Sequence, residues 1–417
     1  MKGTLLWLVT FSAQLSFSQT KLSSSLKQLS QQNQFAKMDN LNKKVNNKDY
    51  YLYKAIFANV CNKPEISILY LDSLKNNYIG NTYEFAKLKY DNYIKLFNYD
   101  KAYSMSRTLT STFQKHFTKA ELIDEINAQR IWKTVRNKPT QYIGQFSTII
   151  LRTSKDMAGL TTTMVSANNT ISSFVFDTGA GISCITETIA NKMNVMLMPG
   201  KNITVQSLTG QGCKIKVGMT PYLNIGDLKL KNVLFLVYPD SAFTFGNGAY
   251  TINGIIGFPI IKELGTIIIE KERITCSKIL KAGSNERNLF VDQLRAIIML
   301  TYEGKTIPFN FDSGAKTSLF NKSFYQSFQV YLDSIGIMAI NKASGAGAKE
   351  VVTNVLQVKG QTLYLNQKKI QIPVMTIDKN NYGVYGKVNY GNIGQDLIGQ
   401  YKKLTISFDQ NYVELEN

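Results

Sequence analysis

Two short stretches of this sequence decide the fold. Residues 174–180 read Phe-Val-Phe-Asp-Thr-Gly-Ala, and residues 309–315 read Phe-Asn-Phe-Asp-Ser-Gly-Ala. Each has an apolar approach, an aspartate (Asp177 or Asp312) and a turn of small residues. A single Asp-Thr-Gly or Asp-Ser-Gly tripeptide would more often be a structural turn. The presence of two copies is therefore what makes these stretches informative.

The surroundings of the two aspartates repeat as well. At the same offset downstream of each aspartate stand Thr-Gly-Gln-Gly at 209–212 and Ser-Gly-Ala-Gly at 344–347. Farther on, Gly257 of an Ile-Ile-Gly run and Gly394 of an Asn-Ile-Gly run follow their aspartates at nearly equal spacings. Landmarks that share their order and their approximate spacing indicate that the two halves descend from one unit or fold as one.

The part of the chain that contains both stretches has the composition of an all-β region. From Phe146 onward, short runs of Ile, Val, Thr and Phe alternate with Gly and Asn, which predicts many short strands. The polar stretch 283–287 divides this region. We therefore predict two similar β lobes, at residues 145–282 and 288–417.

The repeated loops suit acid–base chemistry on a shared water. Two such loops that face each other across an axis would bring two carboxyl groups together, and like charges about 3 Å apart cannot both ionise. The pair then holds one proton, so one member acts as a base and the other as an acid. We predict Asp177 and Asp312 as the catalytic pair. The predicted supporting residues of the two loops are Thr178, Gly179, Ala180, Ser313, Gly314 and Ala315.

The residue counts exclude several other chemistries. His116 is the single histidine, so Ser-His-Asp or Cys-His catalysis would have to use it, and a site with several histidine ligands is excluded. The four cysteines have no Cys-x-x-Cys spacing, which excludes a zinc finger. We expect neither a metal nor a cofactor. We also expect His116 at the surface and Cys184, which has apolar neighbours, as a buried thiol.

The N-terminal part of the chain predicts export and a helical domain. Residues 1–18 combine Lys2, a short apolar run and small residues, as a secretory signal peptide does. No later segment holds about 18 uninterrupted apolar residues, so no membrane segment is expected after signal removal. Residues 19–138 show helical periodicity, with a helix opening at Pro64, a break near Asn98 and a last helix to Val135. Helix pairs repeat there with a period of about 35 residues, which is close to the period of tetratricopeptide repeats.

The formal net charge is +19, from 48 Lys and Arg against 29 Asp and Glu. A basic surface could bind acidic partners or an anionic membrane. We favour a solvated surface rich in Lys and Asn, because no interleaving of aromatic and basic residues marks a nucleic-acid site.

From about Phe146 to its end, the chain resembles the aspartic peptidases, and their retropepsin-like branch in particular. The resemblance rests on the two Asp-Thr/Ser-Gly-Ala motifs and on the run Ile-Ile-Gly at 255–257, while both lobes on one chain resemble the pepsins. It implies two lobes of a six-stranded-barrel type, related by pseudo-twofold symmetry, and catalysis by Asp177 and Asp312. It also implies flap hairpins that close over an extended peptide, with the substrate-binding residues Ser207, Leu208, Thr209, Gly210, Gly212, Ser344, Gly345 and Gly347.

The chain departs from the pepsin pattern in three places. Residues 206–209 lack the flap tyrosine, and Asn392 replaces the first apolar residue of the second apolar-apolar-Gly run. Ala180 and Ala315 stand where pepsins carry a hydroxyl that stabilises the charged carboxylate. Without that hydroxyl the pair should be less acidic. We therefore expect activity at weakly acidic to neutral pH.

The leading interpretation is an exported aspartic endopeptidase, periplasmic or extracellular, that acts on polypeptides and carries a helical domain able to bind a protein partner. One alternative is an inactive peptidase-like scaffold that binds peptides, with the helical domain recruiting a partner. A weaker alternative is a surface-binding module that uses the basic charge. Neither a nucleic-acid partner nor an integral membrane segment is expected. The helical domain could also shade the cleft or act as a pro-region.

Overall fold

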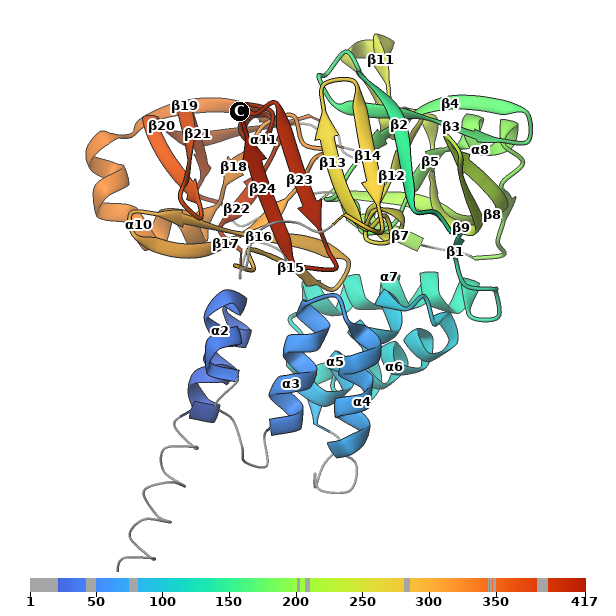
Figure 1. Ribbon diagram of the computed structural model, residues 1–417, viewed down its shortest axis with the longest axis horizontal. Helices are drawn as coiled ribbons and strands as arrows, with labels where there is room; N and C mark the ends of the chain where they lie inside the picture. Colours follow the sequence, from blue (N-terminus) through green and yellow to red (C-terminus); the bar gives the residue numbers. More distant parts are fainter. Residues whose placement is uncertain are drawn as a thin grey trace, which may run out of the picture.

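The computed structural model describes residues 22–42, 50–74, 82–200, 203–206, 211–280, 286–343, 345, 347, 350–380 and 389–417. The predicted signal peptide, residues 1–18, lies outside them. The described chain is mostly β, with a helical region below the β region in the view of Figure 1. Among the described residues, no helix is both long enough and apolar enough to cross a membrane.

The helical region begins with a helix over residues 22–31. The helices that follow are α2 (Phe35–Asn42), α3 (Tyr50–Val60), α4 (Pro64–Leu74), α5 (Tyr83–Lys95), α6 (Tyr99–Thr112), the 3-10 turn η1 (Gln114–His116) and α7 (Lys119–Val135). Three sequence predictions are confirmed: Pro64 is the first residue of α4, the helical structure is interrupted at Asn98, and the last helix of the region ends at Val135. The tetratricopeptide-like spacing stays a prediction.

Local capping explains two of these boundaries. The Asn98 side chain accepts a hydrogen bond from the backbone N–H of Lys101 at 3.2 Å, which satisfies a free donor at the start of α6. Thr118 and Glu121 form a reciprocal capping box at the start of α7. Both helices therefore start where their sequence supplies the cap.

The first and larger sheet contains 14 strands among the described residues. Its order is β24-β23-β13-β14-β2-β3-β4-β12-β5-β9-β8-β6, with β1 on β9 and β7 on β8. The strands are β1 (Tyr142–Ile143), β2 (Thr148–Lys155), β3 (Thr161–Ala167), β4 (Thr170–Phe176), β5 (Cys184–Thr186), β6 (Met196–Leu197), β7 (Ile203–Gln206), β8 (Gly212–Ile225), β9 (Leu228–Tyr238), β12 (Gly254–Ile256), β13 (Thr266–Glu270), β14 (Arg273–Ser277), β23 (Lys403–Ser407) and β24 (Tyr412–Glu416).

The second sheet contains eight strands among the described residues, in the order β15-β16-β17-β22-β18-β21-β20-β19. They are β15 (Leu289–Asp292), β16 (Arg295–Tyr302), β17 (Lys305–Phe311), β18 (Leu319–Phe320), β19 (Ile337–Ala343), β20 (Val351–Leu365), β21 (Lys368–Asp378) and β22 (Gly391–Ile393). The remaining elements are the pair β10 (Thr244–Phe245) and β11 (Tyr250–Thr251), and α8 (Glu187–Lys192), η2 (Asp240–Phe243), η3 (Gly246–Gly248), α9 (Phe258–Ile261), α10 (Lys322–Ile335) and α11 (Gln395–Ile398).

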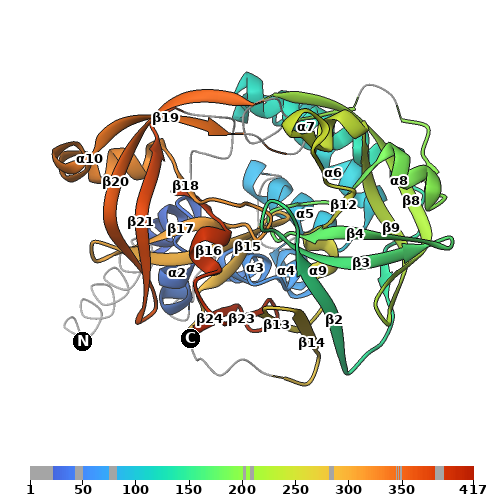
Figure 2. The same ribbon diagram turned by 90° about the horizontal axis from the view of Figure 1, so that it is seen from above.

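Each half contains a ring of six paired strands: β3-β4-β12-β5-β9-β8 with β8 back on β3, and β16-β17-β22-β18-β21-β20 with β20 back on β16. Neither sheet as a whole is a closed barrel, because further strands extend beyond each ring. The last two strands of the chain, β23 and β24, leave the second half and join the sheet of the first half, where β23 pairs with β13. Strands of the two halves therefore lie side by side, between the halves in Figure 1 and along the lower edge of the view in Figure 2. The strands that the second half contributes thus extend the first sheet beyond its ring of six strands.

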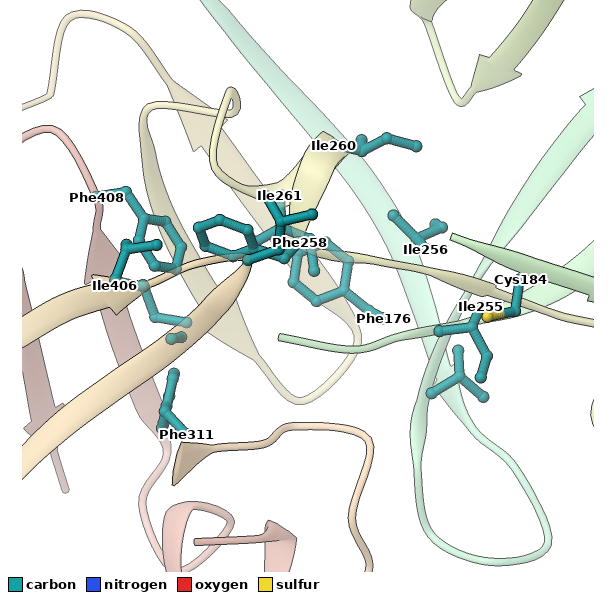
Figure 3. Packing of buried hydrophobic residues seen from close by; sticks show 14 of the residues in the cluster. Phe176, Cys184, Ile255, Ile256, Phe258, Ile260, Ile261, Phe311, Ile406 and Phe408 are labelled. Atoms are coloured by element: carbon teal, nitrogen blue, oxygen red, sulfur yellow. The ribbon is translucent and has the colours of Figure 1, made fainter. Parts of the chain in front are cut away.

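A shared apolar core connects the two halves at this junction. Phe176 and Phe311, which precede the two aspartates, are 1% and 0% exposed and belong to the same cluster. The ring of Phe258 on α9 meets that of Phe408, after β23, edge to face, with 5.1 Å between their centroids (Figure 3). The strands that carry the aspartates are thus anchored in one continuous core.

The helical region packs closely against the edge of the second sheet. Phe290 on β15 contacts Phe35 on α2, with 5.4 Å between ring centroids, in a cluster that also contains Met38 and Tyr53. Asn33, before α2, donates a hydrogen bond to the side chain of Asn389 at 2.9 Å, and both residues are buried. Because β15 is an edge strand, the helices also cover backbone that would otherwise be open to pairing.

Candidate active site

Parallel strand pairing places each aspartate. β4 pairs with β12, and the backbone N–H of Asp177 donates to the carbonyl of Ile256 at 3.0 Å. β17 pairs in the same way with β22, and the N–H of Asp312 donates to the carbonyl of Ile393 at 3.0 Å. The Ile-Ile-Gly and Asn-Ile-Gly runs, which the sequence comparison of the two halves matched, therefore hold the two loops in equivalent backbone settings.

Reciprocal hydrogen bonds lock the two loops to each other. The Thr178 hydroxyl donates to the carbonyl of Phe311 at 2.7 Å and accepts from the N–H of Ser313 at 3.0 Å. The Ser313 hydroxyl donates to the carbonyl of Phe176 at 2.8 Å and accepts from the N–H of Thr178 at 3.0 Å. Thr178 and Ser313 are 0% and 1% exposed, so water does not compete for these bonds.

The two carboxyl groups meet above the glycines that follow them. A Cβ atom built on Gly179 would lie 2.5 Å from the carboxyl carbon of Asp312, and one on Gly314 would lie even closer to the carboxyl of Asp177. Each glycine also donates its N–H to the preceding aspartate, at 2.7 Å from Gly179 to Asp177 and 3.0 Å from Gly314 to Asp312. The structure thus brings Asp177 and Asp312 into direct contact.

A methyl group on either glycine should disrupt the pair. We expect Gly314→Ala to reduce the peptide hydrolysis that the sequence predicts at least about a hundredfold, because the added methyl occupies the position of the Asp177 carboxyl and displaces the two carboxyl groups. The measurement is kcat/KM with a peptide substrate. Gly159→Ala is the matched control, since Gly159 also lies in a turn and a Cβ there meets no atom within 4 Å, although its φ of +84° favours glycine. Equal losses in both variants would argue against the steric explanation.

The surroundings favour one shared proton. Removal from water by the surrounding protein, and then the neighbouring Asp312, raise the pKa of Asp177 well above its ordinary value. The N–H groups of Gly179 and Gly314 act in the opposite direction. The net rise means that Asp177 holds its proton at pH values where an ordinary aspartate is ionised.

Sequence reasoning missed three polar side chains that support the site. Ser183 accepts from the N–H of Gly257 at 3.1 Å, and Ser318 accepts from the N–H of Gly394 at 2.8 Å. A signal was present, because the two serines stand at the same offset from their aspartates. The third is Asn392, whose amide donates to Oδ2 of Asp312 at 2.8 Å. The sequence marks it only as a departure from the expected apolar residue.

The two predicted flap segments coincide with β-hairpins. β7 pairs with β8 so that Gln206 lies opposite Gly212, and β19 pairs with β20 so that Ala343 lies opposite Val351. Gly345 and Gly347 lie in the second turn. The remaining predicted flap residues lie outside the described residues: Ser207, Leu208, Thr209, Gly210 and Ser344.

The second hairpin reaches across to the first half. The N–H of Gly347 donates to the carbonyl of Ala242 at 2.8 Å, and a Cβ on Gly347 would lie 3.2 Å from both Tyr238 and Cys213. Tyr238 in turn interacts with the thiol of Cys184, whose pKa is raised by burial and by Asp177. The hairpin turn is therefore connected to the immediate surroundings of the dyad.

Other predicted features lie away from the site or have no part in it. His116 is exposed and stacks on the ring of Tyr83, with 4.3 Å between centroids, as expected of a surface residue. Cys184 is a buried thiol, as predicted, and no disulfide links the four cysteines, all of which the structure describes. Ala180 and Ala315 follow the glycines and offer the carboxyl groups no side-chain donor. Within the described residues, no cluster of three or more His, Cys, Asp or Glu side chains could hold a metal ion.

Comparison with known proteins agrees with this geometry for the first half. A search of curated proteins found no match. The family model described as aspartyl protease matches residues 163–260, a segment that contains Asp177 and the Ile-Ile-Gly run and ends before Asp312. This match supports an aspartic protease-like domain in that part of the chain, and with it a protease-like, hydrolytic function.

Proposed function

We propose that the chain is an exported, bilobal aspartic endopeptidase whose two β halves are related by a pseudo-twofold axis through the dyad. The observation that carries the proposal is the contact between the carboxyl groups of Asp177 and Asp312, held by loops that exchange hydrogen bonds in both directions. Export rests on the sequence of residues 1–18. The substrate is a polypeptide in an extended conformation, covered by the two hairpins.

The proposed reaction is the direct attack of water on a peptide carbonyl. The ionised member of the dyad takes a proton from the water as its oxygen bonds to the carbonyl carbon, and the protonated member donates its proton to the carbonyl oxygen. The tetrahedral intermediate then collapses as the C–N bond breaks. The amine nitrogen receives the proton taken from water, and the intermediate returns a proton to the other carboxyl. No covalent enzyme intermediate forms.

The helical region is proposed to remain part of the working enzyme rather than to be removed as a pro-region. Its α7 contacts β7, the first strand of the first hairpin, and the N–H of Thr204 on β7 lies 3.4 Å from Oδ1 of Asn127 on α7. Residues of β15 and β16 are buried against α2 and α3. Removing the helices would expose this apolar surface, which favours retention.

The pH dependence follows from the raised pKa of Asp177. The active form holds one proton, and this form is lost when the pH rises through the pKa of the protonated member. Because that pKa is raised, activity should extend to weakly acidic and neutral pH. The measurement is a pH profile of kcat/KM. A maximum below about pH 3 would contradict this prediction.

Cleavage of a mixed peptide library, across a range of pH and with and without a pepstatin-type inhibitor, tests the proposal. Inhibitor-sensitive endoproteolysis supports it, and the cleavage sites define the subsite preference. Saturable peptide binding without any cleavage would instead identify an inactive, peptide-binding scaffold.

A further inference from the structure

We propose that Asn392 gives the two carboxyl groups different roles. Its amide holds Asp312 as the ionised base, so that Asp177 carries the shared proton and acts as the acid. This inference rests on the proposed function and deepens it. Asn392 contacts Asp312 and acts through it, which makes it a positioning residue rather than a catalytic one.

The hydrogen bonds to the two carboxyl groups are unequal. Both oxygens of Asp312 accept, Oδ1 from the N–H of Gly314 at 3.0 Å and Oδ2 from the Nδ2 of Asn392 at 2.8 Å. Asp177 accepts from the N–H of Gly179 at 2.7 Å, and the N–H of Gly314 and the carboxyl of Asp312 also lie within hydrogen-bonding reach of it. An ionised carboxylate accepts at both oxygens, whereas a protonated one must use one oxygen to donate. The additional side-chain donor therefore favours charge on Asp312.

The corresponding position in the first half supplies no donor. Strand register makes Ile255 the counterpart of Asn392, since Ile255 lies opposite Val175 and Asn392 lies opposite Asn310 in equivalent parallel pairs. Ile255 is 6% exposed and apolar. The difference between an isoleucine and an asparagine at one matched position thus makes an otherwise similar pair of loops asymmetric.

Strand pairing on both sides fixes the amide in place. β22 pairs in parallel with β17 and antiparallel with β18, so that the Asn392 backbone lies between Asn310 and Leu319. A donor on a paired central strand loses little further freedom when it binds the carboxylate. Asp312 itself is 8% exposed, so water contributes little to the stabilisation of its charge.

Charged groups on neighbouring elements do not reverse this asymmetry. Across the dyad lies Asp177, whose raised pKa agrees with its holding the proton. Lys155 on β2 donates to Oε1 of Gln395, and the Nε2 of Gln395 donates to the carbonyl of Ser313, so this cation acts on the Asp312 loop only through an amide. Asp396 on α11 accepts from Ser318, and Lys316 in the same loop is exposed.

The decisive variant is Asn392→Leu, which has a similar volume and no donor. In a plot of kcat/KM against pH, the acid limb reports protonation of the base. Loss of the hydrogen bond from Asn392 to the charged base should move this limb to higher pH by about one unit. KM at the new optimum should change little. Asn392→Ala is the second variant should Asn392→Leu fail to fold. An acid limb that stays within about 0.3 unit of wild type would overturn the inference.

Two further variants separate this role from a structural one. Asn310→Val copies Val175 and removes the neighbouring amide, which binds Asn389 rather than the dyad, so the acid limb should stay in place. The exchange variant Ile255→Asn/Asn392→Ile moves the donor to the Asp177 side. It should restore the acid limb toward wild type, while Asn392→Ile alone should not. An acid limb at the same pH in Asn392→Ile and in the exchange variant would show that Asn392 serves packing only.

A measurement without turnover distinguishes failure of this inference from failure of the proposed function. In the Asp177→Asn background a single dyad carboxyl remains, and its titration can be followed by carbon NMR of aspartate-labelled protein, assigned by its loss in Asp312→Asn. Adding Asn392→Leu should raise the pKa of this carboxyl by about one unit. If Asn392→Leu shifts this titration but the wild-type protein cleaves no peptide, the inference stands and the proposed peptidase function is rejected. If wild type cleaves peptides but Asn392→Leu causes no shift, the peptidase function stands and the inference is rejected.

Discussion

Asp312→Asn is expected to abolish peptide hydrolysis while the protein stays folded. The asparagine keeps the shape of the side chain, and its Oδ1 still accepts from the N–H of Gly314. It cannot take a proton from water, and general acid–base catalysis alone contributes about a hundred- to ten-thousandfold. We therefore expect a loss of at least about a thousandfold in kcat, measured with the best peptide from the library. Asp177→Asn should give the same loss, because no proton donor then remains.

The matched control is Asp378→Asn. Asp378 ends β21 and is 3% exposed, and its carboxyl accepts from the N–H and the side chain of Asn380, away from the dyad. An asparagine there keeps the acceptor and should leave cleavage unchanged. Thermal unfolding of all three variants shows whether the fold is retained. Wild-type cleavage by Asp312→Asn would show that the hydrolysis does not depend on the dyad.

The repeated motif made the centre of the site predictable from sequence. Two aspartates, each followed by a hydroxyl residue and glycine, indicated that Asp177 and Asp312 would meet and that Thr178 and Ser313 would support the two loops. The structure has this arrangement. The prediction depended only on local turns and on duplication, both of which a sequence displays directly.

Features that depend on pairing between distant strands were harder to predict from the sequence. The short apolar runs from Phe146 onward predicted many short strands, but nothing in β23 indicates that it pairs with β13 of the other half. The prediction of six-stranded lobes therefore missed the extension of the first sheet by strands of the second half. Asn392 was interpreted as a weaker match to an apolar position, because the sequence does not show that its side chain reaches Asp312. Its chemical contrast with Ile255 was nevertheless visible once the two halves were aligned.

Burial of the helical region against the β region leads to the second large effect, which centres on Lys95. This lysine ends α5 and is 0% exposed. Its Nζ donates to Oδ2 of Asp91 at 3.0 Å, to the backbone and side chain of Asn59 at 3.0 and 2.7 Å, and to the carbonyl of Val291 at 3.2 Å. Val291 belongs to the edge strand β15, so one ammonium group joins two helices to the second sheet.

Burial of this group has a cost that its partners offset. Removal from water lowers the pKa of Lys95 and raises that of Asp91, and each residue's charge opposes the shift of the other. Breaking such a pair by removing one member leaves the other buried without compensation, which typically destabilises by about 3–5 kcal/mol. Lys95→Ala should therefore lower the free energy of unfolding by about this amount, measured by urea denaturation.

Two comparisons make the result interpretable. Lys216→Ala removes an exposed ion pair with Glu187, whose Nζ–Oε1 distance is 2.7 Å, and should change stability little. Lys95→Met/Asp91→Leu removes both buried charges and should recover part of the loss, although the carbonyl of Val291 stays without its donor. Because Lys95 connects the helices to the second sheet, Lys95→Ala should shift the unfolding of both regions together. An unfolding curve that matches wild type, or a shift confined to the helices, would mean that the ammonium group does not couple the two regions.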